Sequence, residues 1–397
     1  QLKGDEMTRI HDCNAVNEVV QLLADEGFEG MAQAIQILLN EAMKLERSDA
    51  LQAGPYERTD ARTGYANGFK KKTVHSRMGE LELHVPQTRG VEFYPSAIER
   101  GERSERALKV AIAEMYVQGV STRKVVAITR KLCGLDITST QVSRAAQMLD
   151  EELEAWRQRA LEKVDYLLFD ARYEKVRHGG SVRDCSVLVA TGVTPHGSRT
   201  ILGVSVSLSE AEVHWRQFME CLISRGLSAV RFIVSDDHSG LNAARKACFP
   251  GIPWQRCQCH LQRNAIAYVP KVEMRAVVAS DIRKVFNAPD QHEANRQLKL
   301  TVAKYKDTAP RLSEWMDSNL REGLTVFELP ESHRRRMRTT NMLERLNQEI
   351  KRRTRVATLF PNEASLLRLV SAVLIEISEE WKTGKRYLNM AHTDAAL

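Results

Sequence analysis

The sequence lacks any run of 18 or more apolar residues, so we expect no transmembrane helix. Its first residues are charged and polar, without the apolar stretch of a secretory signal peptide. Its seven cysteines, an odd number scattered over 397 residues, argue against a disulfide scaffold and favour a reducing compartment. These absences exclude membrane-spanning and disulfide-rich secreted classes and predict a cytoplasmic protein.

Clustered positive charge is what the chain does have. Its length suffices for two to four domains, and 43% hydrophobic with 27% charged residues is ordinary for a soluble globular protein. The net charge is +7, and residues 331–355 carry nine basic and three acidic side chains. Such clustering predicts nucleic-acid binding. The alternative interpretation is a solvated set of helix faces balanced by acids elsewhere.

The first 50 residues read as helical. Apolar side chains recur at helical spacing over residues 14–47, and the two glycines within 26–30 suggest a break into two helices. This region could dimerise, contact DNA or form a structural bundle, and the pattern does not choose among the three.

A basic hairpin is predicted next. Residues 72–76 and 80–85 read as paired strands, the second with strict alternation, after turn-rich stretches at 54–58 and 64–68. Three lysines, Lys70 to Lys72, stand beside Tyr65 and Phe69, a combination that fits a surface gripping a DNA backbone.

Three short helices are predicted over residues 106–118, 122–133 and 139–149. Ser121 is the expected N-cap of the second helix and Gly134 its stop, while Ser139 or Thr140 would cap the third. This resembles a helix-turn-helix, with Arg123, Gln141 and Arg144 as DNA contacts. Small helical bundles that bind nothing give the same pattern.

From residue 163 the periodicity becomes that of strands. The order is three strands, a helix, a strand, a helix and a strand, at residues 166–176, 185–191, 200–208, 210–225, 230–234, 241–248 and 252–255. This order describes a ribonuclease H-like mixed sheet, so we expect an α/β core within an α+β chain. In such a sheet the first strand lies beside the fourth.

Two aspartates fall at neighbouring places in that sheet. Asp170 lies mid-way along the first strand, and Asp236 directly follows the fourth. Polar ligands gather at such strand ends. The bland alternative for Asp170 is a carboxylate that caps a turn. Asp237 is a rival to Asp236, and we favour a helix-capping role for it.

An all-α insertion is expected over residues 257–335, followed by a basic helix at 339–351. Leu343, Leu346 and Ile350 would form its buried stripe, and Asn341, Glu344, Asn347 and Lys351 its polar stripe. Three carboxylates at a sheet edge could hold two Mg²⁺ ions, with Mn²⁺ as a substitute, and support phosphodiester chemistry. The residues assigned to DNA contact are Lys70, Lys71, Lys72, Arg123, Gln141, Arg144, Arg338, Asn341, Lys351, Arg352 and Arg353.

Several motifs spread over nearly the whole chain resemble one family. They are Gly54-Pro-Tyr-Glu-Arg58, Asn67-Gly68, Gly79-Glu-Leu-Glu-Leu-His-Val-Pro86, Phe93-Tyr-Pro95, Met115-Tyr-Val-Gln-Gly-Val-Ser-Thr-Arg123, Phe169-Asp-Ala171, Ser235-Asp-Asp-His-Ser-Gly-Leu241, Gln255-Arg-Cys-Gln-Cys-His260 and Thr340-Asn-Met-Leu-Glu-Arg-Leu-Asn347. The sequence resembles a Mutator-type transposase of bacterial insertion sequences, a DDE enzyme with a ribonuclease H-like core.

The resemblance implies catalytic, metal-binding acids at Asp170, Asp236 and Glu344, which agrees with the choice made from the residues. It also implies binding to terminal inverted repeats, strand cleavage and strand transfer to target DNA by a homodimer on the bacterial nucleoid. A ribonuclease H-like nuclease or resolvase, and an inactive DNA-binding regulator, are the alternatives.

Cys257 and His260 also match the family. They could ligate zinc, but no second Cys/His pair has the required spacing, so a structural or DNA-side role near the active site is favoured. Trp215, Trp254 and Trp315 could stack on distorted DNA, although tryptophans of this kind are more often core residues.

Six consecutive segments are expected. They are 1–50 (helical, dimerisation or DNA binding), 51–100 (small, β-rich and basic), 101–160 (helix-turn-helix-like), 161–256 (first part of the catalytic core), 257–335 (all-α insertion) and 336–397 (catalytic and closing helices).

Overall fold

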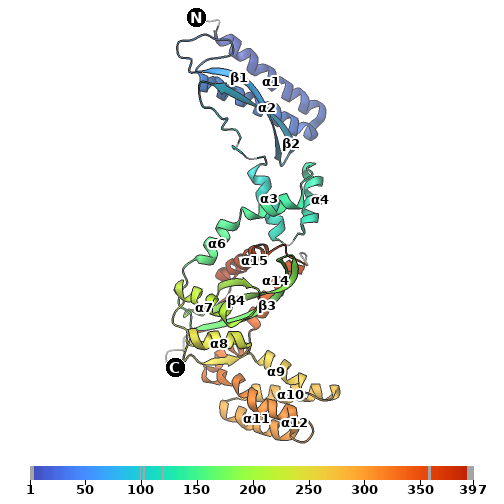
Figure 1. Ribbon diagram of the computed structural model, residues 1–397, viewed down its shortest axis with the longest axis vertical. Coiled ribbons are helices and arrows are strands. Elements are labelled where there is room, and N and C mark those ends of the chain that lie inside the picture. Colours follow the sequence, from blue (N-terminus) through green and yellow to red (C-terminus); the bar gives the residue numbers. More distant parts are fainter. Residues whose placement is uncertain (1–3, 99, 102, 119, 356–358, 391–397) are drawn as a thin grey trace. The chain divides into compact units, whose positions relative to one another are not determined.

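The computed structural model describes residues 4–98, 100–101, 103–118, 120–355 and 359–390 (Figure 1). The chain forms two compact units, one reaching to Met148 and the other starting at Leu149. Within the described residues, no helix is both long and apolar enough to cross a membrane. The six-part division expected from the sequence stays a prediction at this finer level.

The first unit begins with the broken helix pair that the sequence predicts. Helix α1 (Gly4–Glu26) leads through a 3-10 turn, η1 (Gly27–Gly30), into α2 (Met31–Leu51). Gly27 has a φ of +60°, a left-handed conformation that glycine adopts without strain, so the helix breaks here.

The hairpin is longer than the sequence suggests. Strand β1 (Tyr65–Ser76) pairs antiparallel with β2 (Gly79–Arg89), and α2 packs on them through a core that includes Met43 and Leu83. The stretch at 64–68, expected as a turn, is mostly strand with an irregular register between Ala66 and Phe69. Pro86, one residue beyond the predicted second strand, lies inside β2, which tolerates proline because it is an edge strand.

Three helices complete the first unit: α3 (Arg106–Val117), α4 (Thr122–Cys133) and α5 (Ser139–Gln147). The side chain of Ser121 caps α4 as predicted, and Gly134 ends it with a φ of +65°. The cap of α5 is Thr138, one residue before the predicted Ser139, within a capping box completed by Gln141.

The second unit is built on a five-stranded sheet of β3 (Tyr166–His178), β4 (Ser181–Val193), β5 (Arg199–Ser207), β6 (Phe232–Ser235) and β7 (Trp254–Arg256). Their order is β5-β4-β3-β6-β7. The first three strands are antiparallel neighbours, while β6 runs parallel to β3 and to β7. The predicted mixed α/β fold is confirmed, including the first strand lying beside the fourth.

Helices cover both faces of this sheet because residues along β3 alternate between two cores. Leu167 and Phe169 pack with α7 (Glu212–Ser224) and α8 (Ser239–Cys248). Tyr166 and Leu168 face the larger core, which includes side chains from α14 (Asn341–Thr354) and α15 (Glu363–Thr383). Asp170, two residues beyond Leu168, belongs to this second face.

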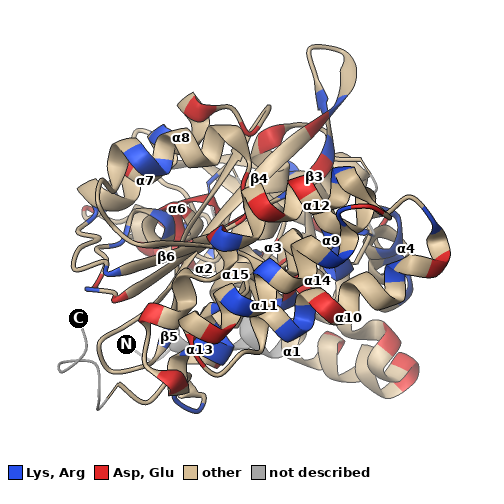
Figure 2. Ribbon diagram, turned by 90° about the horizontal axis from the view of Figure 1, so that it is seen from below, with Lys and Arg blue, Asp and Glu red and all other residues tan. Residues whose placement is uncertain are grey.

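The insertion between β7 and α14 is helical in every described element, as expected. Its elements are α9 (Gln258–Ala267), η2 (Val272–Met274), α10 (Arg275–Phe286), α11 (Gln291–Tyr305), α12 (Pro310–Asn319), η3 (Leu320–Gly323), η4 (Thr325–Glu328) and α13 (Glu331–Met337). The sequence did not indicate α9. Figure 2 shows the basic positions of α13, which lie on the last turn of that short helix.

Helix α6 (Asp150–Gln158) opens the second unit, held by a bidentate ion pair between Asp150 and Arg368 of α15. Beyond the C-terminal end of α15, the backbone N–H groups of Tyr387 and Leu388 donate hydrogen bonds to the carbonyl of Gly197, and Leu388 is buried. The segment up to residue 390 is therefore tied to the core.

Candidate functional site

The register of the sheet places Asp170 level with Asp236. Leu168 of β3 is the partner of Val234 in the parallel ladder with β6. Two residues further along each strand come Asp170, still within β3, and Asp236, directly after β6. Two carboxylates from neighbouring strands therefore meet at one edge of the sheet.

Asp170 is held tightly. It is 8% exposed, its Oδ1 accepts a hydrogen bond from the backbone N–H of Ala171 at 3.0 Å, and its Oδ2 accepts one from Asn347 Nδ2 at 2.8 Å. Arg172 Nη1 in turn donates to the backbone carbonyl of Asn347 at 2.9 Å. These bonds fasten α14 to β3 beside the carboxylate.

Burial dominates the electrostatics of Asp170. Burial raises the pKa of its carboxyl to about 7, against the opposing charge of His260, and the negative charges of Asp236 and Cys257 add to the rise. The N–H of Ala171 only partly offsets this effect. A bound cation would remove the penalty, so the position suits a metal ligand.

Asp236 and Asp237 have different surroundings, which separates the candidate from its rival. Asp236 accepts one hydrogen bond at Oδ1 from the backbone N–H of His238, at 3.2 Å. Asp237 forms an ion pair of 2.9 Å with Arg256 and also accepts from Asn242. The predicted helix-capping role of Asp237 is wrong, because His238 is the N-cap of α8 and no side chain caps it.

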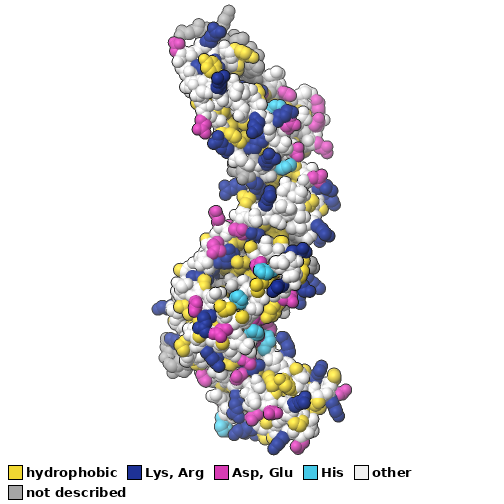
Figure 3. Space-filling view, viewed as in Figure 1, with side chains coloured by type: hydrophobic (Ala, Val, Ile, Leu, Met, Phe, Trp, Pro, Cys, Tyr) yellow, Lys and Arg dark blue, Asp and Glu magenta, His cyan; other side chains and the backbone are white. Residues whose placement is uncertain are grey.

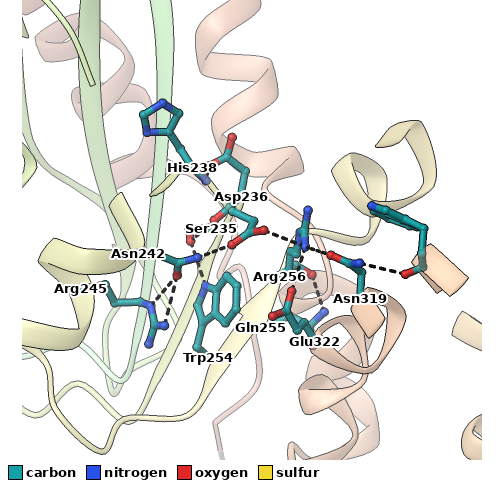
Figure 4. A network of polar contacts seen from close by, with 12 residues as sticks. Ser235, Asp236, His238, Asn242, Arg245, Trp254, Gln255, Arg256, Asn319 and Glu322 are labelled. Atoms are coloured by element: carbon teal, nitrogen blue, oxygen red, sulfur yellow. Dashed lines mark hydrogen bonds and ion pairs between the residues drawn. The ribbon is translucent and has the colours of Figure 1, made fainter. Parts of the chain in front are cut away.

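Arg256 joins the end of β6 to the insertion (Figure 4). Its Nη1 lies 2.9 Å from Asp237, 2.8 Å from Glu322 and 3.1 Å from Asn319, and the residue is only 4% exposed. The motif at 255–260 includes Arg256, but nothing in the sequence indicates its contacts, because its partners come from segments that lie about 20 and 65 residues away. It fixes the loop that carries Asp236.

Glu344 stands in the first turn of α14 and is half-buried. The predicted apolar stripe of this helix is buried as expected, at Leu343, Leu346 and Ile350. Within the described residues, no group of three or more His, Cys, Asp or Glu side chains is placed to hold a metal ion. The structure thus brings Asp170 and Asp236 together, without Glu344 in a ligating arrangement with them.

Cys257 and His260 lie against the same site. Thr340, just before α14, donates to Cys257 Sγ from both its N–H and its hydroxyl at 3.5 Å. Hydrogen bonding from Cys259, then from His260, lowers the pKa of Cys257 to about 3 despite burial. Cys257 in turn raises the pKa of His260 to about 9, helped by Asp170 and Asp236. This pairing puts a positive imidazolium beside the two aspartates.

The three tryptophans considered for DNA stacking all have contacts within the protein. Trp215 is fully buried between α7 and the sheet, and Trp254 donates from Nε1 to Ser235 Oγ at 2.9 Å. Trp315 stacks on Tyr268, with ring centroids 5.4 Å apart. The DNA-stacking interpretation is therefore not retained for Trp215.

The basic residues assigned to DNA fall into two groups. Arg353 is 5% exposed and paired with Glu349 and Glu376, so its charge is neutralised within the protein and we drop it from the DNA contacts. Gln141 completes the cap of α5, and Arg338 donates to Asn287 at 2.7 Å. The assigned residues with exposed side chains are Lys70, Lys71, Arg123, Gln141, Arg144, Asn341, Lys351 and Arg352.

The lysines of the hairpin do not share one face. Lys70 and Lys72 are opposite Val85 and Leu83 in the ladder, whereas Lys71 alternates to the other side and pairs with Glu82 at 2.6 Å. Lys72 donates to the Tyr94 hydroxyl at 3.0 Å. Lysine and arginine side chains gather over the hairpin on the face that Figure 3 shows.

With this geometry in place, comparison with known proteins identifies the class. Residues 7–384 match the family model described as Transposase, Mutator family. The chain belongs to the Mutator family of transposases.

Individual transposases of insertion sequences match this chain over most of their length. The chain is 53% identical over 380 residues to a transposase for insertion sequence element IS406 of Burkholderia multivorans, covering 95% of this chain and 98% of the relative. It is 43% identical to the ISRM5 transposase of Rhizobium meliloti, covering 91% of each. It is 34% identical to the IS256 transposase in Tn4001 of Staphylococcus aureus, covering 96% and 99%.

Among solved structures, a chain of a simian T-cell lymphotropic virus intasome in complex with PP2A regulatory subunit B56 gamma shows a weak likeness. The TM-score is 0.18 at 13% identity, over 49% of this chain and 67% of that chain. A score this low carries no argument about fold or function.

Proposed function

We propose that this chain is the DNA transposase of a bacterial insertion sequence, acting on the nucleoid. It binds the terminal inverted repeats of its element, cleaves a DNA strand there and transfers the freed 3′-OH to target DNA. The observation that carries the chemistry is the meeting of Asp170 and Asp236 on neighbouring strands, in a chain that belongs to the Mutator transposase family.

The donor set suits Mg²⁺, with Mn²⁺ as a substitute. Asp170 and Asp236 offer carboxylate oxygens, which hard divalent cations prefer. Burial raises the pKa of Asp170, so a cation bound there would stabilise its charged form. Glu344 would supply the third carboxylate from α14. Two ions bound there would supply Lewis-acid activation of the attacking oxygen and stabilise the leaving one.

The side chains around the acids have supporting roles. Asn347 fixes the orientation of the Asp170 carboxylate, and Arg256 holds the loop of Asp236 by pairing with Asp237. The His260 imidazolium limits the repulsion between the two aspartates. Asn341 and Lys351, exposed on α14, are positioned to contact phosphate next to Glu344.

The reaction has two balanced steps. In the first, a water oxygen attacks a phosphorus at the element's end, the bond from phosphorus to the 3′ oxygen breaks, and a 3′-OH and a 5′-phosphate result. In the second, that 3′-OH forms a new phosphodiester bond in target DNA while a target 3′ oxygen leaves. Each step exchanges one P–O bond, which is why one carboxylate site serves both.

DNA binding is assigned chiefly to the first unit and to α14. Arg123 and Arg144 are exposed on α4 and α5, the helix pair that resembles a helix-turn-helix, and Lys70 is exposed on β1. A homodimer would bring the two ends of the element together, because each end needs its own active site.

A cleavage assay tests this function. Purified protein, Mg²⁺ and a labelled duplex carrying the element's terminal repeat should give a nick at the repeat boundary, followed by joined products when target plasmid is added. A duplex with a scrambled repeat should remain uncut. Equal cutting of both duplexes would indicate a nuclease without end specificity, and binding with no cutting in Mg²⁺ or Mn²⁺ would indicate a DNA-binding regulator.

A further inference from the structure

The loop after α2 holds a tyrosine in an unfavourable backbone conformation. Glu57 N–H donates to the Gly54 carbonyl at 3.3 Å, closing a four-residue turn, and Glu57 Oε2 accepts from Gly54 N–H at 2.7 Å. Tyr56 is the third residue of this turn and has a φ of +60°. Glycine or asparagine is normal at such a position. Where a sequence breaks a local rule like this, the side chain is usually needed for function.

The Tyr56 side chain has no structural task within the protein. It is fully exposed, although it sits in a turn that is firmly hydrogen-bonded. A second exposed ring, that of Tyr65 at the start of β1, lines the same hollow as Tyr56. The Arg62 guanidinium carbon lies 5.1 Å from the centroid of the Tyr65 ring. Arg62 is itself fixed, because it donates to the carbonyls of Glu57 and Gly64 at 2.5 and 2.9 Å.

A hollow of about 1010 Å³ lies between these elements and is lined by both tyrosines. Arginines Arg47, Arg58 and Arg62 also line it, with Asp60 as the lining carboxylate. Three positive charges against one negative leave it electropositive. The hollow lies wholly within the first unit.

Arg47 and Arg58 are available to an anion. Arg47 is half-buried, its pKa is lowered by burial, and its guanidinium lies 4.9 Å from the ring of Phe69. Among the described residues, neither Arg47 nor Arg58 has a carboxylate within ion-pair distance. A guanidinium partly removed from water without an acid partner favours an incoming anion, because the anion restores its lost solvation.

We propose that this hollow binds one unpaired nucleotide of the element's DNA, with its base on the Tyr56 ring and its phosphate on Arg47 and Arg58. Arginines combined with exposed aromatic rings bind single-stranded nucleic acid through stacking and phosphate contacts, whatever the base. The inference rests on the proposed function, since it specifies one contact of the DNA that a transposase binds. It also gives a role to the motif at residues 54–58.

Tyr56→Gly is the sharpest test, because glycine relieves the positive φ while removing the ring. The full chain is titrated into a terminal-repeat duplex with a short single-stranded extension, followed by fluorescence anisotropy. We expect about tenfold weaker binding, with a melting temperature equal to or above that of the unmodified protein. Phe28→Ala is the matched control, because Phe28 is an almost fully exposed ring in the same unit; it should leave affinity unchanged.

Arg58→Ala tests the phosphate contact. The slope of log Kd against log salt should fall by about 0.7, the value for one phosphate of a single strand. Arg296→Ala, which removes an exposed arginine of α11 already paired with Glu293, should leave the slope unchanged. If Tyr56→Gly binds as tightly as the unmodified protein and Arg58→Ala keeps its slope, the subsite is overturned and the transposase function stands. Failure of the unmodified protein to bind any terminal-repeat DNA would overturn both.

Discussion

The two units of this chain carry their polar side chains in opposite ways. In the second, Asp170 is buried in a central strand and held by a side-chain amide from a helix 177 residues further on. In the first, the lysines and arginines of the hairpin and of α4 and α5 are mostly exposed, and several have partners on neighbouring elements. We infer from this difference that the two proposed activities respond differently to single substitutions. Catalysis depends on a few fixed side chains, whereas DNA binding is the sum of many small contributions.

The adjacent pair Asp236 and Asp237 gives the sharpest test of whether catalysis depends on a few fixed side chains. Asp236→Asn should reduce strand cleavage by more than about 10³-fold, because it removes a proposed metal ligand at constant shape. Asp237→Asn should cost far less, since that side chain pairs with Arg256 outside the metal site. Rates measured under single-turnover conditions with pre-bound DNA decide between them. Equal losses for the two variants would show that the sequence position of the second acid is misassigned.

Asn347 tests whether the buried site needs its orienting contact. Asn347→Ala should lower cleavage about 10- to 100-fold and raise the Mg²⁺ concentration for half-maximal rate, because it frees the Asp170 carboxylate that the amide now holds. Gln348→Ala is the matched control, being an exposed amide one position along α14. A loss of rate that saturating Mg²⁺ leaves unchanged, together with a lower melting temperature, would point to a structural role instead.

Asp281, on α10 of the insertion, tests how much a fixed carboxylate in the second unit contributes to stability. Burial alone would raise the pKa of Asp281, but hydrogen bonds from Lys304, Lys284 and Tyr305 lower it to about 2. Because this lies below the ordinary value of about 4, the stabilisation is present above pH 4 and is lost as the pH falls towards 2. Asp281→Asn should destabilise the fold at pH 7 by about 1–3 kcal/mol.

Chemical denaturation at pH 7 and at pH 3 measures this effect. The difference in unfolding free energy between the unmodified chain and Asp281→Asn should shrink at the lower pH. A difference that stays constant or grows would show that the carboxylate is not the stabilising group. Asp290→Asn is a poor control, because Asp290 caps α11; Asp317, exposed on α12, serves better.

The smallest effects are expected in the first unit. Lys70→Ala should weaken DNA binding only a few-fold, and should lower the salt slope by about 0.9 on duplex DNA. Lys71→Ala should change less, because Lys71 lies on the other face and is paired with Glu82. Anisotropy titrations at several salt concentrations provide both numbers. A loss of more than a hundredfold from either lysine would contradict the idea of many small contributions.

Local sequence pattern predicted much of the fold. The period-two strands, the cap at Ser121 and the apolar stripe of α14 depend on residues within a few positions of one another, so they could be recognised directly. The strand order then followed from the sequence of elements, and with it the meeting of Asp170 and Asp236. Both rest on rules that act at short range or on chain topology.

Long-range contacts could not be predicted. Arg256 meets partners from two distant segments, Asp237 in one and Asn319 with Glu322 in the other. Asn347 reaches Asp170 across 177 residues, so no spacing in the chain marks either role. The amide of Asn347 did carry a signal, since it shares a helix face with Glu344. No signal in the sequence indicates that Arg353 is buried. Arg353 belongs to a basic run whose other members are mostly exposed, and its acidic partner Glu376 lies on a different helix.

Strand cleavage by Asp170→Asn, compared with Asp184→Asn, tests the central claim most directly. Both are isosteric changes of a carboxylate on the same sheet, but Asp184 is exposed on β4, opposite Lys175. With terminal-repeat DNA and Mg²⁺, Asp170→Asn should lose cleavage by more than about 10³-fold while its affinity for that DNA stays within a few-fold, and Asp184→Asn should cleave normally. Undiminished cleavage by Asp170→Asn would contradict the assignment of the site.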